Sequence, residues 1–139
     1  MMSEQTQAVV RQVVAAWNSH DPVHVAAHYT EDCRVMDVAI AQPPVGREGV
    51  QRMFEAYYHA FPDLAITPDT IITEGNRAAI FWTAHATHQG PILSIPPSGR
   101  TVTARGVNYL VLRDSKVCET LTIWDVAGML RGLGLLPDL

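Results

Sequence analysis

The sequence predicts an α+β fold, in which helices cover one face of a mostly antiparallel sheet. Apolar residues recur at helical spacing through most of residues 4–60, and from residue 64 onward they alternate at the period of a strand. Turn residues separate these later runs, as is typical of strands joined by short connections. The longest pair of runs, residues 77–113, predicts an extended hairpin with a proline- and glycine-rich joint near its middle.

The first half of the chain is expected to hold three helices and one strand. Each helix has a single apolar stripe, which is the pattern of a helix that packs on one side only. Asp21 suits the N-cap of the second helix, and Pro22 suits its first position, where a missing N–H costs nothing. The expected helices are residues 4–18, 22–29 and 47–60, with a strand at residues 33–38.

The second half is expected to hold four strands and a short last helix. Pro68 interrupts the first of these strands, which favours a place at the sheet edge or a bulge. Asp63 suits the turn before that strand, and Asp125 suits the N-cap of the last helix. The expected strands are residues 64–73, 78–88, 101–112 and 117–124, and the helix is residues 126–133.

Length and composition predict one globular domain that spans residues 1–139. The net charge is −4 and no cluster of Lys and Arg is present, so no nucleic-acid partner is expected. No apolar run approaches the roughly 20 residues of a membrane helix, and the first residues do not resemble a signal peptide. We therefore expect no membrane partner and a cytoplasmic location, with Cys33 and Cys118 reduced.

One face of the predicted hairpin has the composition of a small-molecule pocket. Alternation places Trp82 and His88 on the same side of the first strand, among alanines that leave room beside the indole. Asn108 is the lone polar group on an apolar face of the return strand. An apolar surface with a few polar groups is typical of a ligand pocket. The alternative is that His88 and Asn108 are structural residues with hydrogen-bond partners in the protein.

The opposite face of the return strand is also partly apolar. It carries Val107, Tyr109 and Val111 between Arg105 and Arg113. An exposed apolar sheet face usually has a partner, and oligomers of identical chains are most often symmetric dimers. The sequence therefore predicts a homodimer that packs through the outer face of the sheet.

Few side chains are placed for acid–base or metal chemistry. Asp37 ends a strand of mostly apolar residues, a setting in which a carboxylate can serve as a general acid or base. His24 and His28 share a helix face, but the Glu of a zinc HExxH motif is missing, so no metal site is expected. The sequence also lacks a P-loop and a GxGxxG turn, so no nucleotide cofactor is indicated.

Four segments make the whole chain resemble the SnoaL-like polyketide cyclases of the nuclear transport factor 2-like superfamily. They read AFPDL, THQG, IPPSGR and WDVAGMLRGLG, at residues 60–64, 87–90, 95–100 and 124–134. The resemblance implies a cone-shaped α+β barrel, with a curved, mostly antiparallel sheet wrapped around three helices from the first half of the chain. It also implies a conical pocket, a homodimer and no cofactor. Similar proteins close rings by intramolecular aldol addition.

The chain departs from that family at two positions of the catalytic pair. The acid–base Asp of the aldol cyclases corresponds to Thr122, and their His corresponds to Asn108. A second resemblance, to the strand of ketosteroid isomerases that ends in the general base, nominates Asp37 instead. The Tyr of those isomerases has no counterpart, because the matching helix position is Val13.

The resulting hypothesis is a cofactor-independent cyclase acting on a polyketide-derived or similarly hydrophobic intermediate. Asp37, His88 and Asn108 are the expected catalytic residues, working by acid–base chemistry. Alternatively, the pocket is a template that brings the ends of a reactive chain together, as a pericyclic closure requires. Two other readings stay open, an isomerase, dehydratase or hydrolase on the same pocket and a non-catalytic binding domain. The expected substrate-binding residues are Tyr57, Phe61, Trp82, Thr122 and Trp124.

Overall fold

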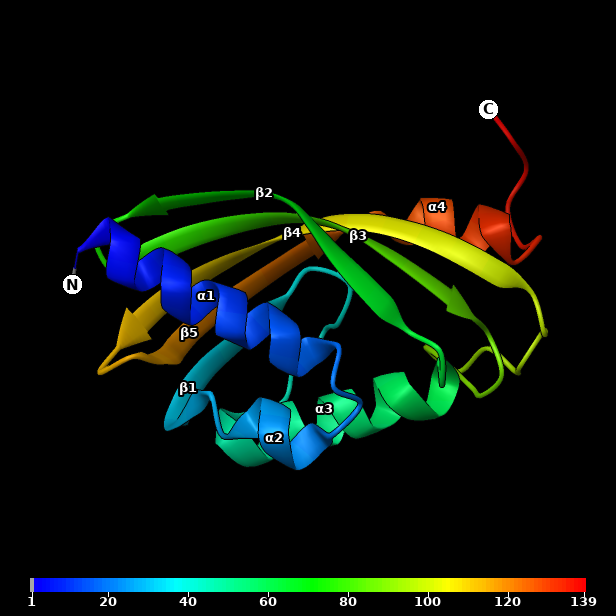
Figure 1. Cartoon of the computed structure of the whole chain (residues 1–139). Helices are drawn as coiled ribbons and strands as arrows, with labels where there is room; N and C mark the ends of the chain where they lie inside the picture. The colour runs from blue at the N-terminus through cyan, green and yellow to red at the C-terminus, as the bar shows by residue number, and fades with distance from the viewer. Residues whose placement is uncertain (1) are drawn as a thin grey trace.

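The computed structural model describes residues 2–139 and shows a curved sheet with helices packed beneath it (Figure 1). This arrangement confirms the predicted α+β class. The elements in chain order are α1 Ser3–Trp17, α2 Pro22–Ala26, β1 Tyr29–Asp37, α3 Gly46–Ala60, β2 Ala65–Glu74, β3 Arg77–Thr87, β4 Thr101–Arg113, β5 Lys116–Trp124 and α4 Val126–Gly132.

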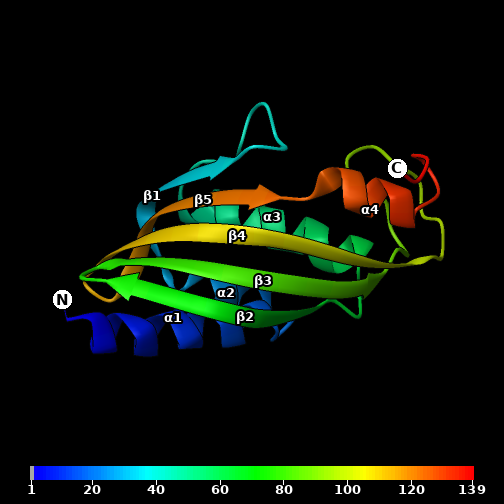
Figure 2. The same cartoon turned by 90° about the horizontal axis from the view of Figure 1, so that it is seen from above.

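The five strands form one sheet in the order β1-β5-β4-β3-β2. β1 runs parallel to β5, and the other neighbouring pairs are antiparallel. The sheet is open, because β1 and β2 lie at opposite edges and do not pair within residues 2–139. Viewed from above, α2 and α3 lie under the strands while α1 runs along the β2 edge (Figure 2). The helices thus cover the concave face, where the core and the cavity described below are formed.

The sequence misplaced the boundary between α2 and β1. α2 ends at Ala26, and Tyr29, expected as the last residue of the helix, begins the strand. β1 pairs irregularly with β5 between Tyr29 and Arg34, so its inward and outward residues do not alternate strictly. That bulge hides the strand period in the sequence. By contrast, β2 is an edge strand with a register shift just after Pro68, as predicted.

The core joins the helices to the sheet through Trp17 at the end of α1. The Trp17 indole donates a hydrogen bond to the hydroxyl of Tyr29, 3.0 Å away. The Tyr58 hydroxyl donates to the Trp17 carbonyl oxygen over 2.6 Å, which links α1 to α3. Val13 of α1 and Ile80 of β3 belong to the same buried cluster. These contacts fix the position of α3 beneath the strands.

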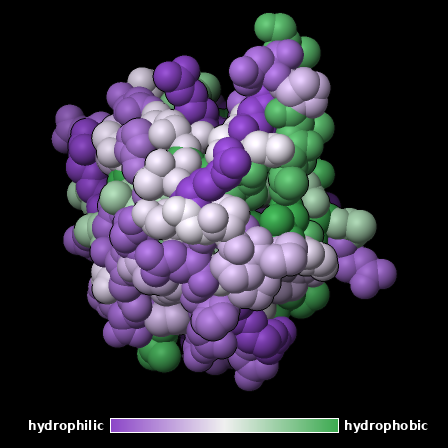
Figure 3. Space-filling model, turned by 90° about the vertical axis from the view of Figure 1, so that its right-hand side faces the viewer, coloured by the Kyte–Doolittle hydropathy of each residue, from purple (hydrophilic) through white to green (hydrophobic). Residues whose placement is uncertain are grey.

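The outer face of the sheet carries a row of exposed and half-buried apolar side chains. Phe81, Val107 and Ile123 are direct neighbours on β3, β4 and β5, and Phe81 and Ile123 are both 46% exposed. A second apolar area is seen from the end of the molecule that holds α4, where apolar surface gathers along one flank (Figure 3). Across residues 2–139, none of the helices combines the length and the apolar character that crossing a membrane requires.

Candidate active site

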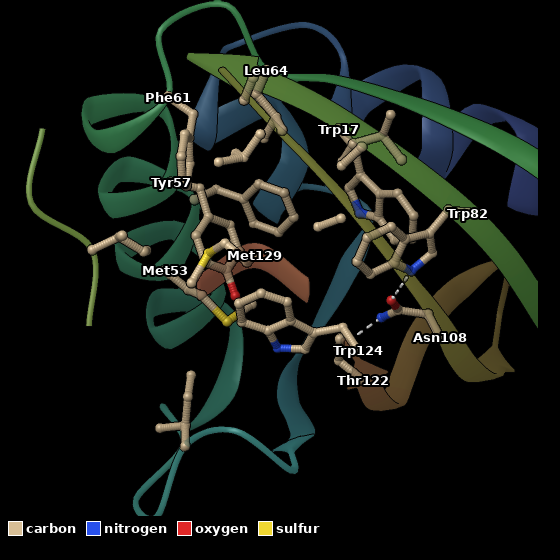
Figure 4. Close-up of a pocket in the computed structure, with 18 of the residues that line it drawn as sticks. Trp17, Met53, Tyr57, Phe61, Leu64, Trp82, Asn108, Thr122, Trp124 and Met129 are labelled. Carbon is tan, nitrogen blue, oxygen red and sulfur yellow. Dashed lines mark hydrogen bonds between the residues drawn. The ribbon is translucent and has the colours of Figure 1, made fainter. Parts of the chain in front are cut away.

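A cavity of about 140 Å³ lies between the concave face of the sheet and α3 (Figure 4). An apolar cavity of this order is large enough for an aromatic ring. All five strands contribute to its wall, and the rest comes from α1, α3, α4 and the connections β1–α3, α3–β2 and β3–β4. Five side chains expected to bind substrate line it: Tyr57, Phe61, Trp82, Thr122 and Trp124.

Small residues on the inner face of the sheet create the space. Ala84 and Ala104 line the cavity as direct neighbours on β3 and β4. Gly106 lies between Trp82 and Trp124 in the next row of the sheet. A Cβ atom on Gly106 would lie 2.4 Å from Cζ2 of Trp82 and 2.7 Å from Cβ of Trp124. The glycine therefore allows two indoles to flank the same strand.

Asn108 forms the centre of a hydrogen-bonded cluster in the cavity wall. The Trp82 indole N–H donates to Oδ1 of Asn108 over 2.8 Å, as Figure 4 shows. The Asn108 amide donates to the hydroxyls of Thr120 and Thr122, at 3.1 and 2.9 Å. An indole can only donate, so the amide oxygen must face Trp82 and the NH2 group must face the two threonines. Both N–H groups of Asn108 are therefore committed to protein partners.

This arrangement leaves the hydroxyl proton of Thr122 available to a ligand. The Thr122 oxygen accepts from Asn108, and no acceptor for its O–H is present among residues 2–139. Thr120 and Thr122 both line the cavity, but Thr120 is only 3% exposed, whereas Thr122 is half-buried. A hydroxyl that already accepts one hydrogen bond can still donate its proton. At the wall formed by β5, the more accessible hydroxyl for a substrate oxygen is thus that of Thr122.

Asp37 lies in the same row of the sheet but does not reach the cavity. It is the direct neighbour of Thr122 across β1 and β5, yet it is only 6% exposed and is absent from the lining. Its Oδ1 atom accepts from the Ala39 backbone N–H at 2.8 Å and from the Trp124 indole at 3.2 Å. The indole lines the cavity, so the expected general base is held behind a substrate-facing side chain.

His88 is also outside the cavity lining. It follows the last residue of β3 and is fully buried, with its ring 5.7 Å from that of Phe61. The Ser98 backbone N–H donates to Nδ1 of His88, and the Ser98 hydroxyl lies 2.9 Å from the same atom. Backbone hydrogen bonds with Gly99 and Arg100 hold the same joint. In this structure His88 joins the two ends of the β3–β4 connection and supports Phe61 from behind.

Several lining residues were not nominated from the sequence. Met129 reaches the cavity because Asp125 caps α4, accepting from the Gly128 backbone N–H at 2.8 Å; the capping role itself was predicted. Met53 and Phe54 belong to the apolar stripe of α3, a signal that identified a buried face but not a cavity. Within residues 2–139, no cluster of three His, Cys, Asp or Glu side chains is arranged to hold a metal ion.

The chain belongs to the SnoaL-like polyketide cyclase family, whose family model matches residues 7–133. No curated protein matches it. Among solved structures, it is similar to AclR, a proposed hydroxylase from Streptomyces galilaeus, with 30% identity and a TM-score of 0.85 over 99% of this chain and 89% of that one.

This chain covers nearly the whole length of two further solved structures. TsrD from Streptomyces laurentii is 26% identical, with a TM-score of 0.86 over 98% of this chain and 99% of its own. IdmH, a proposed polyketide cyclase from Streptomyces antibioticus, is 27% identical, with a TM-score of 0.79 over 94% of this chain and 99% of its own.

Proposed function

We propose that the protein is a cyclase that closes a ring in a polyketide-derived or similarly hydrophobic intermediate. The observation that carries the proposal is the apolar cavity that stays open between Phe61, Trp82 and Trp124. Had these side chains filled the interior, a non-catalytic domain would have been the better reading. Membership of the cyclase family and the likeness to IdmH support the same function. The family resemblance implies that no cofactor takes part.

The cavity favours the template mechanism over acid–base catalysis. Aromatic walls can fold a flexible apolar chain so that its reacting ends meet, and good orientation alone contributes several kcal/mol to lowering a barrier. Thr122 supplies a hydrogen bond to a carbonyl oxygen of the folded chain, with its orientation set by Asn108. Asp37 stabilises Trp124 rather than removing a proton. The substrate's own reactivity then drives the closure.

A homodimer packed through the outer face of the sheet fits the row formed by Phe81, Val107 and Ile123. These side chains are neighbours across three strands, and a contiguous apolar surface of this kind is usually covered by a partner. Such a dimer would leave the cavity on the opposite face of each sheet free. Sedimentation equilibrium of the wild type tests this arrangement.

Blocking the cavity is expected to abolish ring closure. Ala104→Phe places a ring inside the cavity, whereas Thr103→Phe changes the neighbouring residue on the outward side of β4. We would incubate each protein with linear poly-β-ketone and polyene thioester analogues and separate cyclised products by chromatography and mass spectrometry. Ala104→Phe should lose at least about 100-fold in rate, because substrate has no place to bind, and Thr103→Phe should stay within about threefold of wild type.

Three results would count against the proposal. Equal activity of the Ala104→Phe and wild-type proteins would separate the reaction from the cavity. Rearrangement of a double bond without a new ring would favour an isomerase. Saturable binding of these chains with no chemical change in any of them would favour a binding domain.

A further inference from the structure

Tyr57 differs from the other tyrosines on the concave side of the sheet in its hydrogen bonding. The hydroxyl of Tyr29 accepts from the Trp17 indole, and that of Tyr58 donates to the Trp17 carbonyl oxygen. Tyrosine hydroxyls in protein interiors usually find such a partner. The Tyr57 hydroxyl has none among residues 2–139, although its ring lines the cavity. Its hydrogen-bonding capacity is therefore unused by the protein itself.

The ring of Tyr57 is fixed in place by its neighbours. Phe54, one helical turn earlier on α3, packs edge-on against it with ring centroids 5.3 Å apart. Figure 4 shows Tyr57 extending from α3 into the cavity toward Trp124. A phenol that is held by packing and not by a hydrogen bond presents its O–H in a defined direction at little entropic cost.

The surroundings also keep this hydroxyl protonated. Burial raises the pKa of Tyr57 well above its ordinary value, and the nearby carboxylate of Asp37 raises the pKa further. At neutral pH the group is therefore a neutral phenol that can donate one hydrogen bond. In an apolar enclosure such a donor favours a ligand oxygen strongly over a hydrocarbon, which would leave it unsatisfied.

We propose that the hydroxyl of Tyr57 is a substrate-binding donor, and that with Thr122 it selects apolar molecules bearing oxygen atoms at two separated positions. Tyr57 extends from the α3 wall and Thr122 from the β5 wall, so the two donors face the cavity from different sides. Carbonyl oxygens along a hydrophobic chain fit this arrangement. The inference deepens the proposed function and rests on it only in treating the cavity as the substrate site.

A pair of shape-matched probes tests the inference without any turnover. 2-Acetonaphthone carries one carbonyl oxygen, and 2-ethylnaphthalene is its hydrocarbon counterpart. Binding of both is measured by quenching of the indoles of Trp17, Trp82 and Trp124, which all line the cavity. The readout is the ratio of the two dissociation constants, because this ratio isolates the hydrogen bond from the apolar contacts.

The wild type should bind the ketone about tenfold more tightly than the hydrocarbon, as one net hydrogen bond predicts. In Thr122→Val the more accessible donor of β5 is gone, and the Tyr57 hydroxyl should sustain most of the remaining preference. Adding Tyr57→Phe to that variant should therefore lower the ratio further, toward one. The matched control is Tyr58→Phe, which removes a hydroxyl that donates to the Trp17 carbonyl oxygen. This variant should retain the wild-type ratio, even if it unfolds at a lower denaturant concentration.

Two results would overturn the inference. One is a wild type with no preference for the ketone. The other is a double variant whose ratio equals that of Thr122→Val alone. Since neither measurement involves ring closure, a protein that selects the ketone through Tyr57 but forms no ring would contradict the proposed function and leave this inference standing.

Discussion

Replacing Gly106 by alanine is expected to destabilise the protein by about 3 kcal/mol, the upper range for overpacking in a protein interior. The added methyl group would meet Cζ2 of Trp82 at 2.4 Å, and it would also meet the backbone oxygen of Ile123 at 2.8 Å. The indole can rotate, but the strand backbone cannot withdraw without breaking the pairing of β4 with β5. We also expect the displaced indole to close part of the cavity and weaken binding of aromatic probes.

Gly75→Ala is the matched control for this substitution. Gly75 has a positive φ of 57°, but no atom would lie within 4 Å of an added Cβ. The free energy of unfolding of Gly75→Ala should therefore fall by only about 1 kcal/mol, from backbone strain. Urea unfolding of both variants gives the comparison, and a Gly106→Ala protein as stable as Gly75→Ala would contradict the packing described for the two indoles.

Asn108→Leu is expected to lower the free energy of unfolding by about 3 kcal/mol, although the leucine side chain is similar in size to that of asparagine. The substitution leaves the partly buried N–H of Trp82 without its acceptor and removes the donor that orients Thr122. An unsatisfied buried donor costs about 1–3 kcal/mol, whereas removing both partners of a hydrogen bond is often nearly neutral. The loss should therefore depend on whether Trp82 keeps its indole N–H.

A double-mutant cycle with Trp82→Phe tests this reasoning. Phenylalanine has no N–H to leave unpaired, so the double variant should be more stable than the sum of the single losses predicts, by about 1–2 kcal/mol. Denaturant unfolding of the four proteins measures that coupling. Strictly additive losses would show that the Asn108–Trp82 contact does not stabilise the fold.

Strand alternation in the sequence was sufficient to place Trp82 and Asn108 on one face. The register then makes them diagonal neighbours, with Asn108 opposite Ile80 and Trp82 opposite Gly106, close enough for a hydrogen bond. His88 packs against Phe61 on the same side, but it lies beyond Thr87, where β3 ends, and it is absent from the cavity lining. Periodicity predicts which face a side chain occupies only while the strand continues.

The rest of the site depends on contacts between residues far apart in the chain, which no periodic pattern in the sequence reveals. Asp37 was correctly placed at the end of a strand, and its row in the sheet includes Thr122. Its carboxylate is nevertheless bound by Trp124, a residue 87 positions later in the chain. The α3 side of the cavity shows the same limit. The apolar stripe of α3 predicted a buried face, but it could not show that Trp17 would bind the hydroxyl of Tyr58 and leave that of Tyr57 free.

The most direct test of the template mechanism is the rate of ring closure by Asp37→Asn. Asparagine keeps an acceptor for the Trp124 indole and the Ala39 N–H. Its amide is too weakly basic to remove a proton, so it cannot act as a general base. With a chain that the wild type cyclises, we predict a rate within about threefold of wild type. General acid–base catalysis typically contributes roughly 10²–10⁴-fold, so a loss of that size in a folded Asp37→Asn protein would contradict the mechanism proposed for this cavity.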